Sequence, residues 1–241
     1  MQNLYPTLQL IFSLKTMKVS IHQSQYMPWP AYFRKIAMSD KFVLFDDVQF
    51  QKNGVQNRNK LRNKNGEFWL TIPLLGGLEH KINEKIPSDH KWIKKHQQSI
   101  TQSYSKAPYW SEHEDKLLPI YQQNLKRLDK INKLFIDYFL AYLEIETEIF
   151  LSSELNVEGQ KSELVSNLCK EIGASHYISG FGAKDYLDLK SFEKDGIEVS
   201  FVESLNPTYK QFHGNFISSL SILDMIMNVS KDEIKDYMYG N

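Results

Sequence analysis

Residues 19–60 read VSIHQSQYMPWPAYFRKIAMSDKFVLFDDVQFQKNGVQNRNK, and this stretch decides the fold. An apolar run at residues 19–21 leads into a polar, proline-containing segment. Apolar side chains then recur at helical spacing over residues 32–37, and a second apolar run follows at residues 42–45. This order predicts a strand, a loop, a helix and a second strand, which is the opening of an α/β unit.

Polar side chains follow both predicted strands. His22 and Gln23 come after the first strand, and Asp46 and Asp47 come after the second. Open α/β sheets bind ligands beyond the carboxyl ends of their strands, so these residues form the first candidate site. We predict His22 as a general base, with Asp46 or Asp47 orienting it or binding substrate. A core histidine that satisfies backbone groups is the alternative. The loop adds two candidate substrate contacts, Gln25 and Tyr26.

A basic segment follows directly, because residues 51–65 contain five cations and no acid. Arginine can bind an anion through two parallel hydrogen bonds, and asparagine can orient neutral oxygens. The segment therefore predicts a site for a phosphorylated ligand, although a solvated basic hairpin would have the same composition. The candidate contacts are Lys52, Asn53, Asn57, Arg58, Asn59 and Lys60.

A resemblance to a known family covers residues 17–229 and is carried by IHQSQYMPWPAYFRKIAMSD, FVLFDDVQFQKNGVQNRNK, WLTIPL, YISGFGAKDYLD, YKQFHGNF and LSILDMIMN. In these segments the sequence resembles the WbqC-like protein family. Ser24 stands where the family pattern leads us to expect proline, which leaves the loop less rigid. The family is associated with bacterial surface-polysaccharide (O-antigen) biosynthesis, so the resemblance implies a role in that pathway.

The rest of the chain predicts a mostly parallel sheet with two additions. Residues 55–86 predict a β-rich hairpin insertion, including a further short strand at 81–86, and residues 90–145 predict a helical segment that begins after Ser88. The later part returns to βαβ units, which implies parallel pairing. We therefore expect a single α/β domain over residues 17–241, preceded by an extension at 1–16.

Glycines after a later predicted strand mark a second candidate site. Ser179, Gly180 and Gly182 would let the backbone approach a ligand and would free amides for an anion. Any tight turn from strand to helix also uses glycine. Tyr209 and Gln211 alternate along an extended segment and are further candidate substrate contacts.

Composition restricts the partners. Lys plus Arg and Asp plus Glu number 29 each, so no global field favours nucleic acid or an anionic membrane. Residues 1–16 are too short to span a bilayer. Cys169 is the single cysteine, which fits a reducing cytoplasm and a core position. His90 and His96 lack a third ligand at metal spacing, so we expect no metal site, and the sequence identifies no cofactor.

The resemblance implies surface-polysaccharide synthesis, and the predicted anion site favours a transferase within that pathway. Its ligand would be a phosphorylated or nucleotide-activated sugar, and its reaction acyl or related group transfer to a sugar amine or hydroxyl. Two alternatives remain open. One is a nucleotidyl-transfer enzyme in which Asp46 and Asp47 hold Mg²⁺ while Lys52 and Arg58 hold the phosphates. The other is a non-catalytic protein that binds a sugar nucleotide.

Overall fold

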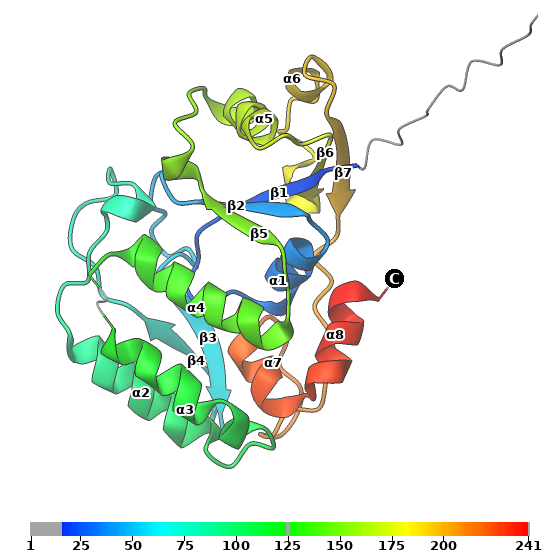
Figure 1. Ribbon diagram of the computed structural model, residues 1–241. Helices are drawn as coiled ribbons and strands as arrows, with labels where there is room; N and C mark the ends of the chain where they lie inside the picture. Colours follow the sequence, from blue (N-terminus) through cyan, green and yellow to red (C-terminus); the bar gives the residue numbers. More distant parts are fainter. Residues whose placement is uncertain (1–15, 124–125, 241) are drawn as a thin grey trace, which may run out of the picture.

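A five-stranded parallel sheet forms the centre of the computed structural model, which describes residues 16–123 and 126–240 (Figure 1). The spatial order is β5-β2-β1-β6-β7. The first strand of the chain therefore lies in the middle, with the next two strands of this sheet on one side and the last two on the other. All four neighbouring pairs are parallel, which confirms the predicted α/β class. The strands are β1 (Lys18–Gln23), β2 (Lys41–Phe45), β5 (Glu148–Leu151), β6 (His176–Gly180) and β7 (Glu198–Val202).

Buried side chains of the central strands point alternately to the two faces of the sheet, and each face has its own hydrophobic cluster. Val19, Ile21 and Val43 belong to one buried cluster, whereas Phe42 and Leu44 belong to the other. Successive side chains of a strand point to opposite faces, so both faces of the sheet must be covered. The smaller cluster includes residues of α5 (Lys161–Glu171) and α6 (Lys190–Glu193). The larger one includes residues of α1 (Pro30–Ala37), α4 (Leu128–Leu143), α7 (Ile222–Asn228) and α8 (Lys231–Tyr239).

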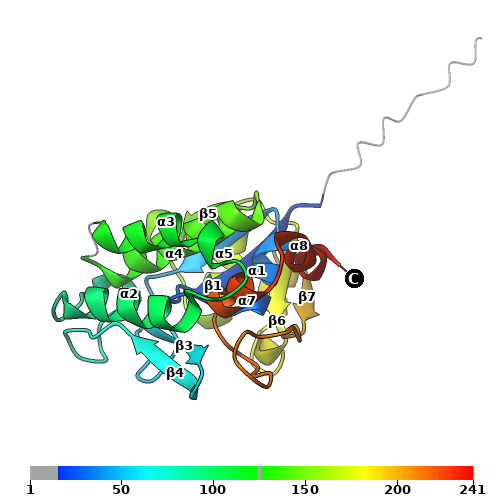
Figure 2. The same ribbon diagram turned by 90° about the horizontal axis from the view of Figure 1, so that it is seen from below.

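The predicted insertion contains an antiparallel hairpin that is separate from the main sheet. It comprises β3 (Arg58–Asn63) and β4 (Gly66–Thr71), and it lies beside α2 (Lys91–Tyr104) at one end of the molecule (Figure 2). Its inward side chains, Leu61 and Leu70, join the larger core cluster.

Residues 81–86 do not form the predicted strand. Ile82–Glu84 is a 3₁₀ helix, η1, in which the Lys85 amide donates to the Ile82 carbonyl at 3.1 Å. The Glu84 carboxylate also accepts from the Lys81 amide at 2.8 Å, and these two bonds close a tight turn.

The helical segment is present and begins after Ser88, at Lys91. The Asp89 carboxylate accepts from the Lys91 amide at 2.7 Å, and α2 starts at that lysine. The segment comprises α2 (Lys91–Tyr104), η2 (Trp110–Glu112), α3 (Glu114–Leu117), η3 (Leu118–Gln122) and α4. Two further 3₁₀ helices follow strands of the main sheet, η4 (Ser152–Glu154) and η5 (Phe181–Ala183).

Two histidines are buried in the core with both ring nitrogens bonded. His96 Nε2 donates to the Thr71 carbonyl at 3.1 Å, so its Nδ1 accepts from the Tyr26 hydroxyl at 3.0 Å. His113 repeats this arrangement with the Ile226 carbonyl and the Tyr138 hydroxyl. Burial is the main cause that lowers the pKa of each imidazole to about 4, which keeps both rings neutral.

This burial predicts a loss of stability in acid. The unfolded chain binds a proton at each histidine below about pH 6.5, but the folded protein does so only near pH 4. The free energy of unfolding should therefore fall as pH drops from 6.5 to 4, by up to about 3 kcal/mol for each histidine. Urea unfolding across this range measures the slope.

Carboxylates also titrate here, so variants isolate the histidine contribution. His96→Gln should lower stability at pH 7 and flatten the pH dependence. His90→Gln, at an exposed position, should change neither. Equal slopes for His96→Gln and wild type would contradict the prediction.

Candidate functional site

The two halves of the main sheet separate towards the carboxyl ends of their strands. β1 pairs with β2 as far as Gln23↔Phe45, but it pairs with β6 only at Lys18↔His176 and Val19↔Tyr177. The strand order also reverses between β1 and β6, and open α/β sheets bind ligands at such switch points.

A serine side chain stands where pairing between β1 and β6 stops. The Ser20 hydroxyl is fully buried and donates to the Ile178 carbonyl of β6 at 3.0 Å. A side-chain donor therefore continues the contact between the strands after their register ends. His22 and Gly180 lie beyond this point, at the carboxyl edge of one sheet, as the sequence predicts.

His22 is paired with a buried lysine that the sequence analysis did not select. Its Nδ1 lies 2.9 Å from Lys35 Nζ, and the same Nζ donates to the Ile21 carbonyl at 2.9 Å. The His22 ring also packs against Trp29 and Tyr32, with centroid distances of 5.8 and 4.9 Å. Burial, followed by the charge of Lys35, holds the pKa of His22 well below its usual value.

The two aspartates bind serines rather than His22. Asp46 is fully buried and accepts from the Ser152 hydroxyl at 3.0 Å, the Ser153 amide at 3.0 Å and the Ser153 hydroxyl at 2.7 Å. The side chain of Asp47 shares the single Ser152 hydroxyl proton with Asp46. These bonds connect the end of β2 to the 3₁₀ turn after β5, so Asp46 positions that turn against the end of β2.

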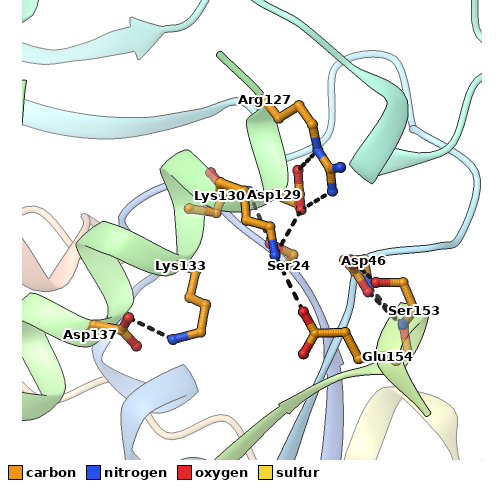
Figure 3. A network of polar contacts seen from close by, with 11 residues as sticks. Ser24, Asp46, Arg127, Asp129, Lys130, Lys133, Asp137, Ser153 and Glu154 are labelled. Atoms are coloured by element: carbon orange, nitrogen blue, oxygen red, sulfur yellow. Dashed lines mark hydrogen bonds and ion pairs between the residues drawn. The ribbon is translucent and has the colours of Figure 1, made fainter. Parts of the chain in front are cut away.

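Charged side chains of α4 cover this end of β2 and β5, as Figure 3 shows. The buried Asp129 accepts two hydrogen bonds from Arg127, at 2.9 and 2.6 Å. Lys130 contacts Glu154 of the 3₁₀ turn at 3.4 Å. The contact between Lys130 and Glu154 connects α4 to the turn after β5 at the carboxyl edge, on the opposite side of β1 from the switch point.

The remaining candidates of the first loop lie deeper in the protein. Tyr26 is fully buried, and its hydroxyl bonds His96 and Tyr121, at 3.0 and 2.6 Å. Asn59 of the basic segment contacts this loop from β3, because its buried side chain donates to the Met27 carbonyl at 2.7 Å. Gln25 is 3% exposed, and its Oε1 has no hydrogen-bond partner within the described ranges.

Gln23 connects the edge to the loop of the basic segment. Its side-chain oxygen accepts from Gln56 Nε2 at 3.0 Å, and Gln56 Oε1 accepts from the Gln51 amide at 2.7 Å. This chain of bonds joins the end of β1 to the segment that carries Lys52 and Arg58.

A cleft of about 230 Å³, which we call the cationic cleft, lies beside that segment. Four predicted residues share its wall with Lys85, a lysine that is only 2% exposed. Aromatic and aliphatic side chains complete the wall. The lining residues are Phe50, Lys52, Asn53, Asn57, Arg58, Thr71, Leu74, Gly76, Leu78 and Lys85.

Backbone carbonyls, not carboxylates, hold two cations of the cationic cleft. Arg58 donates to the carbonyls of Asn53 and Gly54, at 2.6 and 3.2 Å, and stacks 4.2 Å from the Trp69 ring centroid. Lys85 donates to the Gly76 carbonyl at 3.1 Å and also to that of Gly77.

No carboxylate in residues 16–123 and 126–240 forms an ion pair with Arg58 or Lys85. The acids of the neighbouring turn, Glu79 and Glu84, contact His80 instead, at 3.3 and 3.6 Å. The cleft therefore keeps a positive charge that carbonyl dipoles orient but do not neutralise.

Lys60 differs from its neighbours on the hairpin. It forms an ion pair with Glu67 at 2.7 Å and does not line the cationic cleft. The structure thus brings together Lys52, Asn53, Asn57 and Arg58, and it leaves Lys60 and Asn59 outside this group.

The second set of candidates has mixed surroundings. A Cβ added at Gly180 or Gly182 would meet open space, so no neighbour in the chain requires glycine at either position. Ser179 is buried. Tyr209 donates to Asp224 at 2.8 Å, and Gln211 binds Arg62 and both polar backbone atoms of Ile217, so their polar groups organise the C-terminal loop.

Comparison with known proteins identifies the family. The chain matches the WbqC-like protein family over residues 23–236. This protein belongs to the WbqC-like family. It is also 34% identical to the uncharacterized protein Rv1507c of Mycobacterium tuberculosis over 225 residues. The aligned region covers 92% of this chain and 97% of Rv1507c. No solved structure matches the chain.

Two features are absent from the described part of this WbqC-like protein, a membrane-spanning helix and a cluster of metal ligands. No helix in its described part is long and apolar enough to cross a membrane. The same residues contain no group of three or more His, Cys, Asp or Glu side chains that could hold a metal ion.

Sequence reasoning missed two buried lysines of this WbqC-like protein. Lys35 follows Tyr32 by three positions and therefore lies on the apolar stripe of α1, which is a readable signal. Lys85 has no such signal, because its surroundings come from the separate turn at Gly76 and Gly77.

Asp46 provides a test of the strand-end network. Asp46→Asn keeps the shape of the side chain but replaces an acceptor oxygen with a donor, next to the Ser153 amide or hydroxyl. It should reduce the free energy of unfolding by roughly 1–3 kcal/mol, the cost of leaving a buried polar group without its partner. Urea unfolding measures this change. Asp47 is half-buried and accepts one such bond, so Asp47→Asn should reduce the free energy of unfolding by less.

Proposed function

We propose that this WbqC-like protein is a transferase that acts on a phosphorylated or nucleotide-activated sugar in surface-polysaccharide synthesis. The proposal rests on the cationic cleft. Its cations Arg58 and Lys85 donate hydrogen bonds to backbone carbonyls and are not paired with a carboxylate of the described residues. A buried charge is costly unless it is paired, so a cleft of this kind favours an anionic ligand.

The size and chemistry of the cleft suit a small sugar phosphate. About 230 Å³ is below the range of roughly 300–1,000 Å³ that is typical of pockets for drug-sized ligands. The cations can bind phosphoryl oxygens, whereas Asn57 and Thr71 offer groups that can bond hydroxyls.

The carboxyl edge of the sheet is the proposed place of reaction. His22 lies at the switch point, and the Gln23–Gln56 bond joins this edge to the loop of the cationic cleft. A sugar with its phosphate in the cleft could extend an amine or hydroxyl towards His22. We propose transfer of an acyl or related group to this acceptor from an activated donor such as an acyl thioester. The bond between the transferred group and its carrier breaks, the carrier leaves, and the acceptor loses a proton.

The chain belongs to the WbqC-like family, and the resemblance to that family implies the polysaccharide context of the proposal. Asp46 argues for group transfer over the Mg²⁺-dependent alternative, because its carboxylate already accepts three hydrogen bonds from serines.

Binding of a sugar phosphate tests the proposal directly. Glucose 1-phosphate should bind in isothermal titration calorimetry, and neutral glucose should bind far more weakly. Arg58→Ala should weaken binding by roughly 1.5–3 kcal/mol, the range for hydrogen bonds to charged groups. Folding should change little, because the Arg58 side chain is only part-buried.

Lys60→Ala is the matched control. Lys60 lies two positions from Arg58 on β3 and 5.5 Å from the same Trp69 ring, but Glu67 neutralises it. Its replacement should leave the affinity nearly unchanged. An absence of saturable binding, or equal losses in the two variants, would contradict the assignment of the cleft.

Turnover can then be followed with nucleotide sugars and acyl donors. His22→Ala should lower turnover by roughly 10²–10⁴, because it removes the ring that would transfer a proton to the reacting atoms or donate a hydrogen bond to them. Binding of glucose 1-phosphate should remain, because His22 does not line the cationic cleft. Full turnover by a folded variant would remove His22 from the reaction.

A further inference from the structure

We infer that Lys35 is a positioning residue that fixes the tautomer of His22, so that the neutral ring presents Nε2–H as a hydrogen-bond donor to a substrate oxygen. The inference rests on the proposed function for the identity of that substrate. It assigns His22 a donor role at the switch point in place of the general-base role that its position suggests.

The geometry of Lys35 determines which nitrogen of His22 carries the proton. Lys35 Nζ donates to the Ile21 carbonyl at 2.9 Å and lies 2.9 Å from His22 Nδ1. An ammonium group has three donors and no acceptor, so Nδ1 must contribute a lone pair to this contact. In a neutral imidazole, the proton then resides on Nε2.

The surroundings oppose a charged imidazole. Lys35 is 7% exposed and comes from α1, and the His22 ring is otherwise packed against Trp29 and Tyr32. The described residues place no carboxylate within hydrogen-bond distance of His22, since Asp46 and Asp47 bind serines. A proton on Nδ1 would therefore face a cation in a site without a compensating anion.

The free nitrogen of His22 distinguishes it from the core histidines. His96 and His113 each use Nε2 to bond a backbone carbonyl, whereas no hydrogen bond to His22 Nε2 occurs within residues 16–123 and 126–240. Nε2–H is thus available to an oxygen of a phosphoryl, carbonyl or leaving group. A fixed neutral donor stabilises negative charge that develops on such an oxygen without changing its own protonation state.

Lys35 itself defines the pH range of the arrangement. Burial lowers the pKa of its ammonium to about 7, so the donor-only form predominates below that pH. An exposed histidine would be mostly imidazolium at pH 6, because its pKa is about 6.5. The contrast at pH 6 makes the inference measurable.

Long-range proton–nitrogen NMR of the histidine rings provides the test, because it separates the two neutral tautomers from imidazolium. At pH 6, wild-type His22 should be neutral with its proton on Nε2, and its signal is identified by its loss in His22→Gln. Observation of imidazolium, or of the tautomer with the proton on Nδ1, would overturn the inference. This arm needs no Lys35 variant.

Lys35→Met removes the donor while keeping the length and the apolar stem of the side chain. The pKa of His22 should rise towards its ordinary value, because the nearby cation is gone, and the Nδ1–H tautomer should become populated. Lys41→Met is the matched control, because Lys41 donates to the Ile172 carbonyl at 2.9 Å without contacting His22. Identical His22 spectra in Lys35→Met and wild type would overturn the role of Lys35.

The same samples separate this inference from the proposed function. Glucose 1-phosphate binding depends on the cationic cleft, whereas the tautomer of His22 is measured without ligand. Failure of binding with the expected spectrum would contradict the function alone, and normal binding with the wrong tautomer would contradict the inference alone.

Discussion

Parallel pairing of β1 with β2 is the constraint on which the site depends. The register from Val19↔Lys41 to Gln23↔Phe45 fixes where both strands end, and therefore places His22 and Asp46 at one edge. A shift by a single residue would exchange the two faces of a strand. Ile21 would then leave the cluster beneath α5, and His22 would lose its place beside α1.

The same register explains why a buried lysine is tolerated in α1. Lys35 comes from the helix that directly follows β1, and its Nζ reaches back to the Ile21 carbonyl and the His22 ring. The helix that follows β1 thus supplies the group that orients the histidine at the end of that strand. Removing a buried cation from water is costly, and these two acceptors offset part of that cost.

Local patterns in the sequence predict the sheet and its edge well. Apolar runs at residues 19–21 and 42–45 identify the central strands, and βαβ spacing predicts their parallel pairing. Long-range partners are different. Asp46 meets Ser152 and Ser153 more than a hundred positions later, and no periodicity encodes that contact. Tyr26 likewise enters the core because α2 and η3 supply His96 and Tyr121 around its hydroxyl.

The hairpin shows why a run of charge predicts a binding site only in part. Arg58 and Lys60 lie on the same side of β3 and near the same tryptophan ring. Cross-strand neighbours decide their different surroundings, because Glu67 of β4 reaches Lys60, whereas Arg58 turns to the carbonyls of its own loop. The acid that neutralises Lys60 lies outside the acid-free run at residues 51–65, so composition over that run overstates the charge available to a ligand.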